Sequence, residues 1–170
     1  HYGLWTGEME TDIYNLPQAQ QNYSEFLISQ IPEGIHTILD VGCGSGRDLL
    51  WMKKRGFDVI GFERSPGLAE LATDNAACEG MEGDFETYDF STILVDAVLL
   101  VGALVHVPHE GFPRVFENIT SAISDNGSVL ITLKEGSGDL TDSYGRVFYL
   151  WEDPKARELF DILGFKVCNF

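Results

Sequence analysis

A short loop with three alternating glycines, Gly42, Gly44 and Gly46, directly follows an apolar run. Glycine has no Cβ, so such a loop lets the backbone come close to a ligand. The third glycine of the dinucleotide fingerprint G-x-G-x-x-G is missing, because Arg47 stands there, and so is the lysine of a phosphate-binding P-loop. Asp40, two positions before the first glycine, is unfavourable for a phosphate and favourable for a cation. The stretch therefore predicts a ligand that does not bind through phosphate.

Three further polar residues, Glu63, Asp84 and His106, come at or just after the expected ends of other strands. In an open parallel sheet, the carboxyl ends of the strands meet at one edge, and ligands bind there where the strand order reverses. The unperturbed pKa of histidine, near 6.5, suits His106 for general base chemistry. These residues are therefore candidates for one shared site.

The elements that must position them alternate along the chain, with apolar runs separated by glycine or polar breaks and amphipathic segments. This alternation predicts an α/β domain of doubly wound type, with a mainly parallel sheet and helices on both faces. Strands are expected over 36–42, 57–63, 78–84, 95–102, 128–134 and 165–170, with a turn at 125–127. Helices are expected over 18–31, 47–54, 66–75, from 112 onward and over 153–164. The third strand is placed by its order, and an edge strand beside the last one is expected to be missing from this sequence.

The composition restricts the class of partner. Eleven basic against 27 acidic residues give a net charge of −16, which disfavours nucleic acid and anionic lipid and favours a small-molecule partner. No apolar run is long enough for a membrane span, and the N-terminus does not resemble a signal peptide. The three cysteines have no metal-ligand spacing, so no metal site is predicted and a reducing, cytoplasmic location is expected.

The glycine stretch ILDVGCGSG resembles motif I of the class I S-adenosylmethionine-dependent methyltransferases, in particular the small-molecule type 11/25-like domains. Further stretches resemble later motifs of that family in the family's order: DVIGFERSPGLAELA, GDF, VDAVLLVGALVHVP, NGSVLITLKEG and LFDILGFKV. The resemblance covers roughly residues 35 to 170. It divides the single domain 1–170 into an N-terminal lid and helix (1–34), a cofactor-binding core (35–134), an acceptor-side loop (135–152) and the last helix and strand (153–170).

The resemblance implies that S-adenosylmethionine is the cofactor. Glu63 would bind the ribose hydroxyls, Asp84 the adenine amino group, and Phe85 would border the ring. Asp40 would accept backbone hydrogen bonds that hold the loop and would sense the cofactor ammonium. The other implied cofactor contacts are Gly42, Cys43, Gly44, Gly46, Arg47, Arg64, Val101 and Tyr14. The Arg47 guanidinium would either bind the cofactor carboxylate or lie in solvent. The Arg64 guanidinium would either stack on the edge of the adenine ring or lie in solvent.

Methyl transfer from a sulfonium is a direct displacement, in which positioning alone supplies much of the rate. His106 is interpreted either as the general base or as a structural or cofactor contact. An acceptor pocket is expected from Tyr23, Tyr144, Arg146 and Phe148. Arg146 would bind an anionic acceptor or form a salt bridge to Glu135 or Asp142.

The acceptor atom, whether O, N, S or C, and the oligomeric state stay open. A cofactor-binding regulatory subunit without transfer activity is the main alternative. An RNA methyltransferase and an NAD-dependent oxidoreductase are weaker ones. The fourth strand is followed neither by Pro-Cys nor by an Asn/Asp-Pro-Pro-aromatic sequence, which disfavours the nucleic acid enzymes that carry those motifs.

Overall fold

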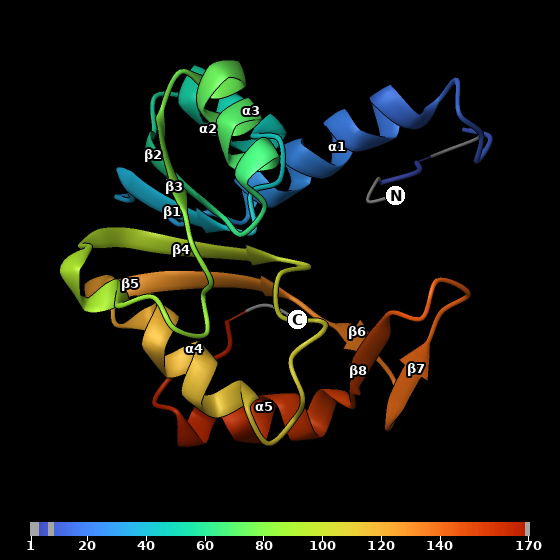
Figure 1. The fold of residues 1–170 in the computed structure, drawn as a ribbon, viewed down its shortest axis with the longest axis vertical. Helices are drawn as coiled ribbons and strands as arrows, with labels where there is room; N and C mark the ends of the chain where they lie inside the picture. Colours follow the sequence, from blue (N-terminus) through green and yellow to red (C-terminus); the bar gives the residue numbers. More distant parts are fainter. Residues whose placement is uncertain (1–3, 7–8, 169–170) are drawn as a thin grey trace.

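The computed structural model describes residues 4–6 and 9–168, and its centre is a five-stranded, fully parallel sheet (Figure 1). The strands are β1 (Thr37–Val41), β2 (Asp58–Glu63), β3 (Glu79–Glu82), β4 (Val95–Val101) and β5 (Ile123–Thr132). Their order in space is β3-β2-β1-β4-β5, so the order reverses between β1 and β4. The predicted doubly wound sheet is confirmed, including the third strand, which was placed by its order.

Helices cover both faces of this sheet (Figure 1). Helices α2 (Arg47–Lys54) and α3 (Pro66–Ala76) lie on one face, and α1 (Leu16–Ser29) packs against α2. Helices α4 (Phe112–Thr120) and α5 (Asp153–Ile162) lie on the other face, and a short 3-10 helix, η1 (Phe90–Thr92), precedes β4. No helix in the part of the chain that the structure describes is long and apolar enough to cross a membrane.

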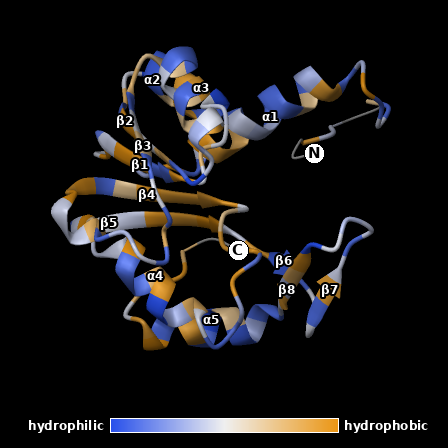
Figure 2. Cartoon of the chain, viewed as in Figure 1, coloured by the Kyte–Doolittle hydropathy of each residue, from blue (hydrophilic) through white to orange (hydrophobic). Residues whose placement is uncertain are grey.

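Alternating side chains of the central strands fill two separate cores. Ile38 and Leu99 pack with α2 and α3, whereas their neighbours Leu39 and Leu100 pack with α4 and α5. All four side chains are buried, as expected where a parallel strand is covered on both faces. The apolar colouring of β4 and β5 in Figure 2 reflects the same arrangement. The central strands therefore hold the carboxyl edge of the sheet rigidly in place.

The segment 135–152 was predicted to be a loop. It instead forms most of a second sheet, which has three strands in the order β6-β8-β7. Its strands are β6 (Lys134–Glu135), β7 (Asp139–Thr141) and β8 (Val147–Trp151). Aromatic and β-branched residues of β8 pack against the loop after β4, and this tertiary packing outweighs the polar, glycine-rich composition of the segment. The small sheet lies beyond the ends of β4 and β5 (Figure 1).

Two other predicted features differ from the structure. Residues 165–168 form no strand, and the rest of the predicted sixth strand lies outside the described residues. Phe165 is held by an edge-on contact with Phe116 at 5.2 Å, so packing and not a strand ladder fixes this segment. The predicted turn at 125–127 lies within β5, where the pairing with β4 jumps from Ile123 to Ser128 and Asn126 has a φ of 63°.

Candidate functional site

The glycine loop lies at the carboxyl end of β1, at the point where the strand order reverses. Its first two N–H groups, from Gly42 and Cys43, both donate to the carbonyl oxygen of Phe62 at 2.7 and 3.3 Å. These bonds turn the chain across the end of β2. The loop therefore connects the ends of two neighbouring strands, which is the usual ligand position in this kind of sheet.

The three glycines of the loop have different structural roles, although all three have positive φ angles, of 78°, 58° and 79°. A Cβ on Gly46 would come within 2.7 Å of the Cα of Ala72 in α3, and one on Gly42 within 3.1 Å of the Cβ of Ala103. A Cβ on Gly44 would meet no atom within 4 Å. Gly42 and Gly46 therefore allow close packing inside the protein, and Gly44 is the glycine that leaves space for a ligand.

Glu63, at the end of β2, holds the glycine loop directly. Its Oε2 accepts a hydrogen bond from the N–H of Gly44 at 2.9 Å, and its Oε1 accepts one from the N–H of Ser65 at 3.0 Å. Each carboxylate oxygen has two lone pairs, so both keep a free acceptor site. The structure thus leaves the capacity of Glu63 to bind two ribose hydroxyls intact.

Asp40 is buried at the end of β1, with 4% of its surface exposed. Among the described residues, none donates a hydrogen bond to its carboxyl group, so the expectation that Asp40 holds the loop is wrong. Burial, followed by the nearby Asp48 carboxylate, raises the pKa of Asp40 to about 8. A buried carboxyl group without a donor fits a site for a cationic group of a ligand.

Arg47 begins α2 and forms a two-point ion pair with Asp48, through Nε at 3.1 Å and the terminal nitrogen at 3.0 Å. Asp48 also accepts a hydrogen bond from the buried hydroxyl of Ser24 in α1. The guanidinium thus has a partner inside the protein. The contact between Arg47 and the cofactor carboxylate stays a prediction. For this contact, the Arg47 guanidinium would have to bind the cofactor in addition to Asp48 or in place of it.

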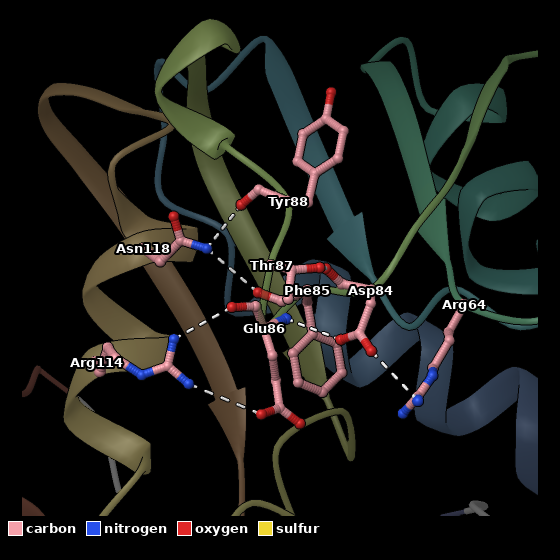
Figure 3. Close-up of polar contacts among 8 residues, drawn as sticks. All are labelled: Arg64, Asp84, Phe85, Glu86, Thr87, Tyr88, Arg114 and Asn118. Carbon is pink, nitrogen blue, oxygen red and sulfur yellow. Dashed lines mark hydrogen bonds and ion pairs between the residues drawn. The ribbon is translucent and has the colours of Figure 1, made fainter.

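Arg64 and Asp84 are brought together by the ends of β2 and β3, with 3.3 Å between the guanidinium nitrogen and Oδ2 (Figure 3). The Arg64 side chain is 70% exposed, so this ion pair contributes little stability. The other oxygen of Asp84 accepts the N–H of Glu86 at 3.0 Å. The turn that presents Asp84 and Phe85 is therefore fixed from within.

Helix α4 anchors the same turn from the opposite side, which sequence analysis did not anticipate (Figure 3). The side-chain amide of Asn118 donates to the carbonyl oxygens of Phe85 at 3.2 Å and Tyr88 at 2.8 Å. Arg114 donates to the carbonyl oxygen of Glu86 at 3.2 Å. The one signal available in the sequence was a polar Asn adjoining the apolar stripe of this helix.

His106 lies in the loop after β4, and its Nδ1 is 2.5 Å from the carbonyl oxygen of Val147 in β8. A carbonyl oxygen can only accept, so Nδ1 carries a proton, and Nε2 is the ring nitrogen that can act as a proton acceptor. A backbone bond from Tyr149 N–H to the Val105 carbonyl, 2.9 Å long, fixes this loop against β8. The ring is exposed, so Nε2 is accessible to an acceptor molecule.

The predicted acceptor residues are only partly brought together. The ring of Phe148 is buried and packs at a tilt of 44° against that of His106, with 4.4 Å between the ring centroids. Arg146 pairs with Asp142 at 2.7 Å, the salt bridge that was one of its two predicted roles. Tyr144 is 85% exposed, and Tyr23 is half-buried on α1. The contribution of these two tyrosines to an acceptor pocket stays a prediction.

The remaining predicted cofactor contacts differ in their surroundings. Tyr14 precedes α1 and is 89% exposed, so its contact with a cofactor stays a prediction. Val101 ends β4 beside Gly102, whose N–H donates to the Thr132 hydroxyl at 2.8 Å. Burial, and then the Asp40 carboxyl, raise the pKa of the Cys43 thiol to about 12. This thiol therefore stays protonated near neutral pH and is a poor nucleophile.

A family model described as a methyltransferase domain matches residues 38–127, more than half of the chain. The chain belongs to the methyltransferase domain family. The match covers the glycine loop, Glu63, Asp84 and His106, and it confirms the resemblance to the S-adenosylmethionine-dependent methyltransferases.

Two curated relatives of this methyltransferase domain are similar over part of their length. Methyltransferase GfsG of Streptomyces halstedii is 29% identical over 152 residues, which cover 84% of this chain and 53% of GfsG. Polyketide synthase ThaQ of Burkholderia thailandensis is 29% identical over 107 residues, which cover 58% of this chain and 5% of ThaQ. The chain thus spans about half the length of GfsG and a small part of ThaQ.

Solved structures share the fold at low identity. The [4+2]-cyclase SpnF superimposes with a TM-score of 0.77 at 19% identity, covering 99% of this chain and 65% of SpnF. The 1,6-didemethyltoxoflavin N1-methyltransferase of Burkholderia thailandensis superimposes with a TM-score of 0.73 at 21% identity, covering 93% of this chain and 72% of the enzyme. Because a cyclase and a methyltransferase share this fold, the reaction has to be argued from the site.

Proposed function

We propose that this domain binds S-adenosylmethionine at the carboxyl edge of its sheet and transfers the methyl group to a small-molecule acceptor. The observation that carries the proposal is the pair of carboxyl groups that flank the glycine loop. Asp40 is buried without a hydrogen-bond donor among the described residues, and Glu63 is bonded to the loop through Gly44 with acceptor sites to spare. An ammonium group and two neighbouring hydroxyls are the partners that these two carboxyl groups lack.

The residues present would hold each part of the cofactor. The space beside Gly44 would take the methionine portion, with its ammonium next to Asp40, and Glu63 would take the ribose hydroxyls. The turn of Asp84 and Phe85, fixed by Asn118, would bind the adenine ring. When bound, the cofactor supplies a methyl group on a positively charged sulfur.

The protein's own contribution to the reaction is to position the acceptor and to remove its proton. The loop after β4 contacts the glycine loop through Ala103, so His106 belongs to the same edge of the sheet. Its Nε2 would accept the proton that the acceptor loses. Positioning of the two reactants would supply of the order of 7–11 kcal/mol in a favourable case.

Charge and similarity support a small-molecule acceptor. The net charge of −16 disfavours the approach of a nucleic acid. The toxoflavin N1-methyltransferase, which has the same fold, was solved with 1,6-didemethyltoxoflavin and S-adenosylhomocysteine bound. The names of GfsG and ThaQ specify no acceptor atom, so the chemical class of the acceptor has to come from the site itself.

Calorimetric titration with S-adenosylmethionine, S-adenosylhomocysteine and NAD tests the cofactor. We expect both sulfur-containing ligands to bind and NAD not to bind, and binding of NAD alone would overturn the proposal. A screen with tritiated methyl donor over metabolite pools then tests transfer. Cofactor binding without any labelled product would favour the alternative, a binding subunit without transfer activity.

A further inference from the structure

Lys134 lies at the acceptor side of the proposed site. It begins β6, two residues after the end of β5, at the edge of the sheet where the glycine loop lies. The ends of β4 and β5 are joined there by the bond from the Gly102 N–H to the Thr132 hydroxyl. Lys134 is therefore placed near the loop that carries His106.

The charge of Lys134 is not neutralised within the described part of the protein. Seven of the eleven basic side chains form ion pairs with carboxylates, namely Arg47, Arg55, Arg64, Arg114, Arg146, Lys155 and Arg157. The side chain of Lys134 forms neither an ion pair nor a hydrogen bond with any described residue, although its backbone belongs to the ladder between β6 and β8. In a chain with 27 acidic residues, a half-buried ammonium without a carboxylate partner is available to bind an anion.

Phe148 connects this ammonium with the proposed base. The Lys134 Nζ lies 3.8 Å from the centre of the Phe148 ring, and the His106 ring lies 4.4 Å from it. The ring is buried, so its position is fixed, and a cation held against an aromatic ring is stabilised there. Lys134 and His106 therefore contact the same buried ring, at the acceptor side of the proposed site.

We propose that Lys134 is a substrate-binding residue whose ammonium holds an anionic oxygen of the acceptor. The acceptor is then a molecule with an acidic hydroxyl, such as a phenol or enol, or with a carboxylate. This inference rests on the proposed methyl transfer and specifies its substrate class. Arg146 differs from Lys134, because its guanidinium already pairs with Asp142.

The ammonium would act through charge alone and keep its three protons. A nearby positive charge lowers the pKa of a hydroxyl group and thereby favours the reactive anion. A hydroxyl acceptor would lose its proton to Nε2 of His106, whereas a carboxylate would arrive already ionised. The acceptor oxygen forms the new bond to the methyl carbon, while the bond from sulfur to that carbon breaks and its electron pair stays on sulfur.

Binding measurements on the protein saturated with S-adenosylhomocysteine test this proposal. The probes are benzoate, 4-nitrophenolate in alkaline buffer, and neutral benzyl alcohol. We expect the wild type to bind at least one of the two anions tenfold or more tightly than the alcohol, and the anion preferred distinguishes carboxylate from phenolate. Lys134→Met should reduce this preference to twofold or less, and Lys134→Arg should retain it.

Lys54 provides a matched control, because it is exposed on α2 and pairs with no described carboxylate. Lys54→Met makes the same change in net charge and should leave the anion preference unchanged. Equal binding of anions and alcohol by the wild type, no anion binding, or a preference that survives Lys134→Met would each overturn the proposal. If the wild type does not bind S-adenosylhomocysteine, the proposed function itself is overturned. An unchanged affinity of Lys134→Met for S-adenosylhomocysteine shows that this variant is folded.

Discussion

The Oε2 of Glu63 accepts a hydrogen bond from the backbone N–H of Gly44 at 2.9 Å. This bond joins the end of β2 to the one glycine of the loop whose side-chain position is open. The residue proposed to bind the ribose therefore also sets the shape of the loop proposed to bind the amino acid portion of the cofactor. Changes at either residue should affect both parts of the site.

Replacing Glu63 should weaken cofactor binding. Glu63→Gln replaces one acceptor oxygen with an NH2 donor that faces a backbone N–H of Gly44 or Ser65, which should lower the affinity for S-adenosylhomocysteine by about ten- to a hundredfold. Glu63→Ala should also lower the free energy of unfolding by about 1–2 kcal/mol, since the N–H groups of Gly44 and Ser65 lose their acceptor. Calorimetry and urea unfolding measure the two effects. Glu82→Gln, at the exposed end of β3, is the control, and an unchanged affinity in Glu63→Gln would remove the ribose assignment.

The glycines of the loop should respond differently to alanine. Gly46→Ala should reduce stability strongly, because the new Cβ would come 2.7 Å from the backbone of Ala72. The new Cβ of Gly44→Ala would meet no atom within 4 Å, so the stability should fall only because alanine disfavours the left-handed backbone conformation, by about 1–2 kcal/mol. The same Cβ should obstruct the cofactor. Thermal unfolding and titration with S-adenosylhomocysteine separate the two outcomes.

Gly34 supplies the control for that comparison. It has a φ of 87°, a Cβ there would meet no atom within 4 Å, and it lies at the opposite end of β1. Gly34→Ala should match Gly44→Ala in stability and leave cofactor affinity intact. If Gly44→Ala binds the cofactor as well as Gly34→Ala does, the space beside Gly44 is not the ligand site.

Asp40 should make the free protein less stable as the pH rises. Its folded pKa of about 8 lies above the ordinary value of 3.8, so between these values the native state holds a proton that the unfolded state lacks. Stability should therefore fall as the pH increases through this window. Urea unfolding at mildly acidic and mildly alkaline pH measures the slope, which Asp40→Asn should flatten. An equal slope in both proteins would show that Asp40 is ionised when folded.

The same carboxyl group should release a proton when the cofactor binds. The ammonium and sulfonium charges favour the ionised form of Asp40, so its pKa should fall on binding. Calorimetry near neutral pH in buffers of different ionisation enthalpy counts the protons released. Asp40→Asn should release none from this position, and it should bind the cofactor more weakly.

His106 should contribute to turnover beyond its structural role. An Asn side chain can donate to the Val147 carbonyl as Nδ1 does, so His106→Asn should keep the fold. Asn offers no base in place of Nε2, so the same variant should lower kcat by about 10²–10⁴. His106→Ala should lose that activity and also about 0.5–1.5 kcal/mol of stability. His109→Gln is the control, because His109 bonds the Leu150 carbonyl at 2.9 Å through Nε2, which a Gln amide can replace as an Asn amide replaces Nδ1. Turnover unchanged by His106→Asn would leave His106 a purely structural residue.

Local patterns in the sequence were sufficient for much of this description. Apolar runs broken by glycine and proline predicted four of the five strands of the main sheet and the helices between them, because burial on both faces requires nearly continuous apolar strands. The third strand, which is mostly exposed, was placed only by its order. The order of Asp40, Glu63 and Asp84 along those strands predicted a shared edge, since parallel strands all end on the same side. The family followed from the same residues and is confirmed by the match over 38–127.

Contacts between residues distant in the sequence were decided only by the tertiary structure. Nothing in the local pattern distinguishes Gly44 from Gly46, because the difference lies in whether Ala72 of α3 is close. The tautomer of His106, the anchoring of the Phe85 turn by Asn118, and the approach of Lys134 to Phe148 likewise depend on partners some 14 to 41 positions away. The sequence by itself determined which chemical groups reach the edge of the sheet, and the packing of separate elements decided which of them are neutralised and which remain available to a ligand.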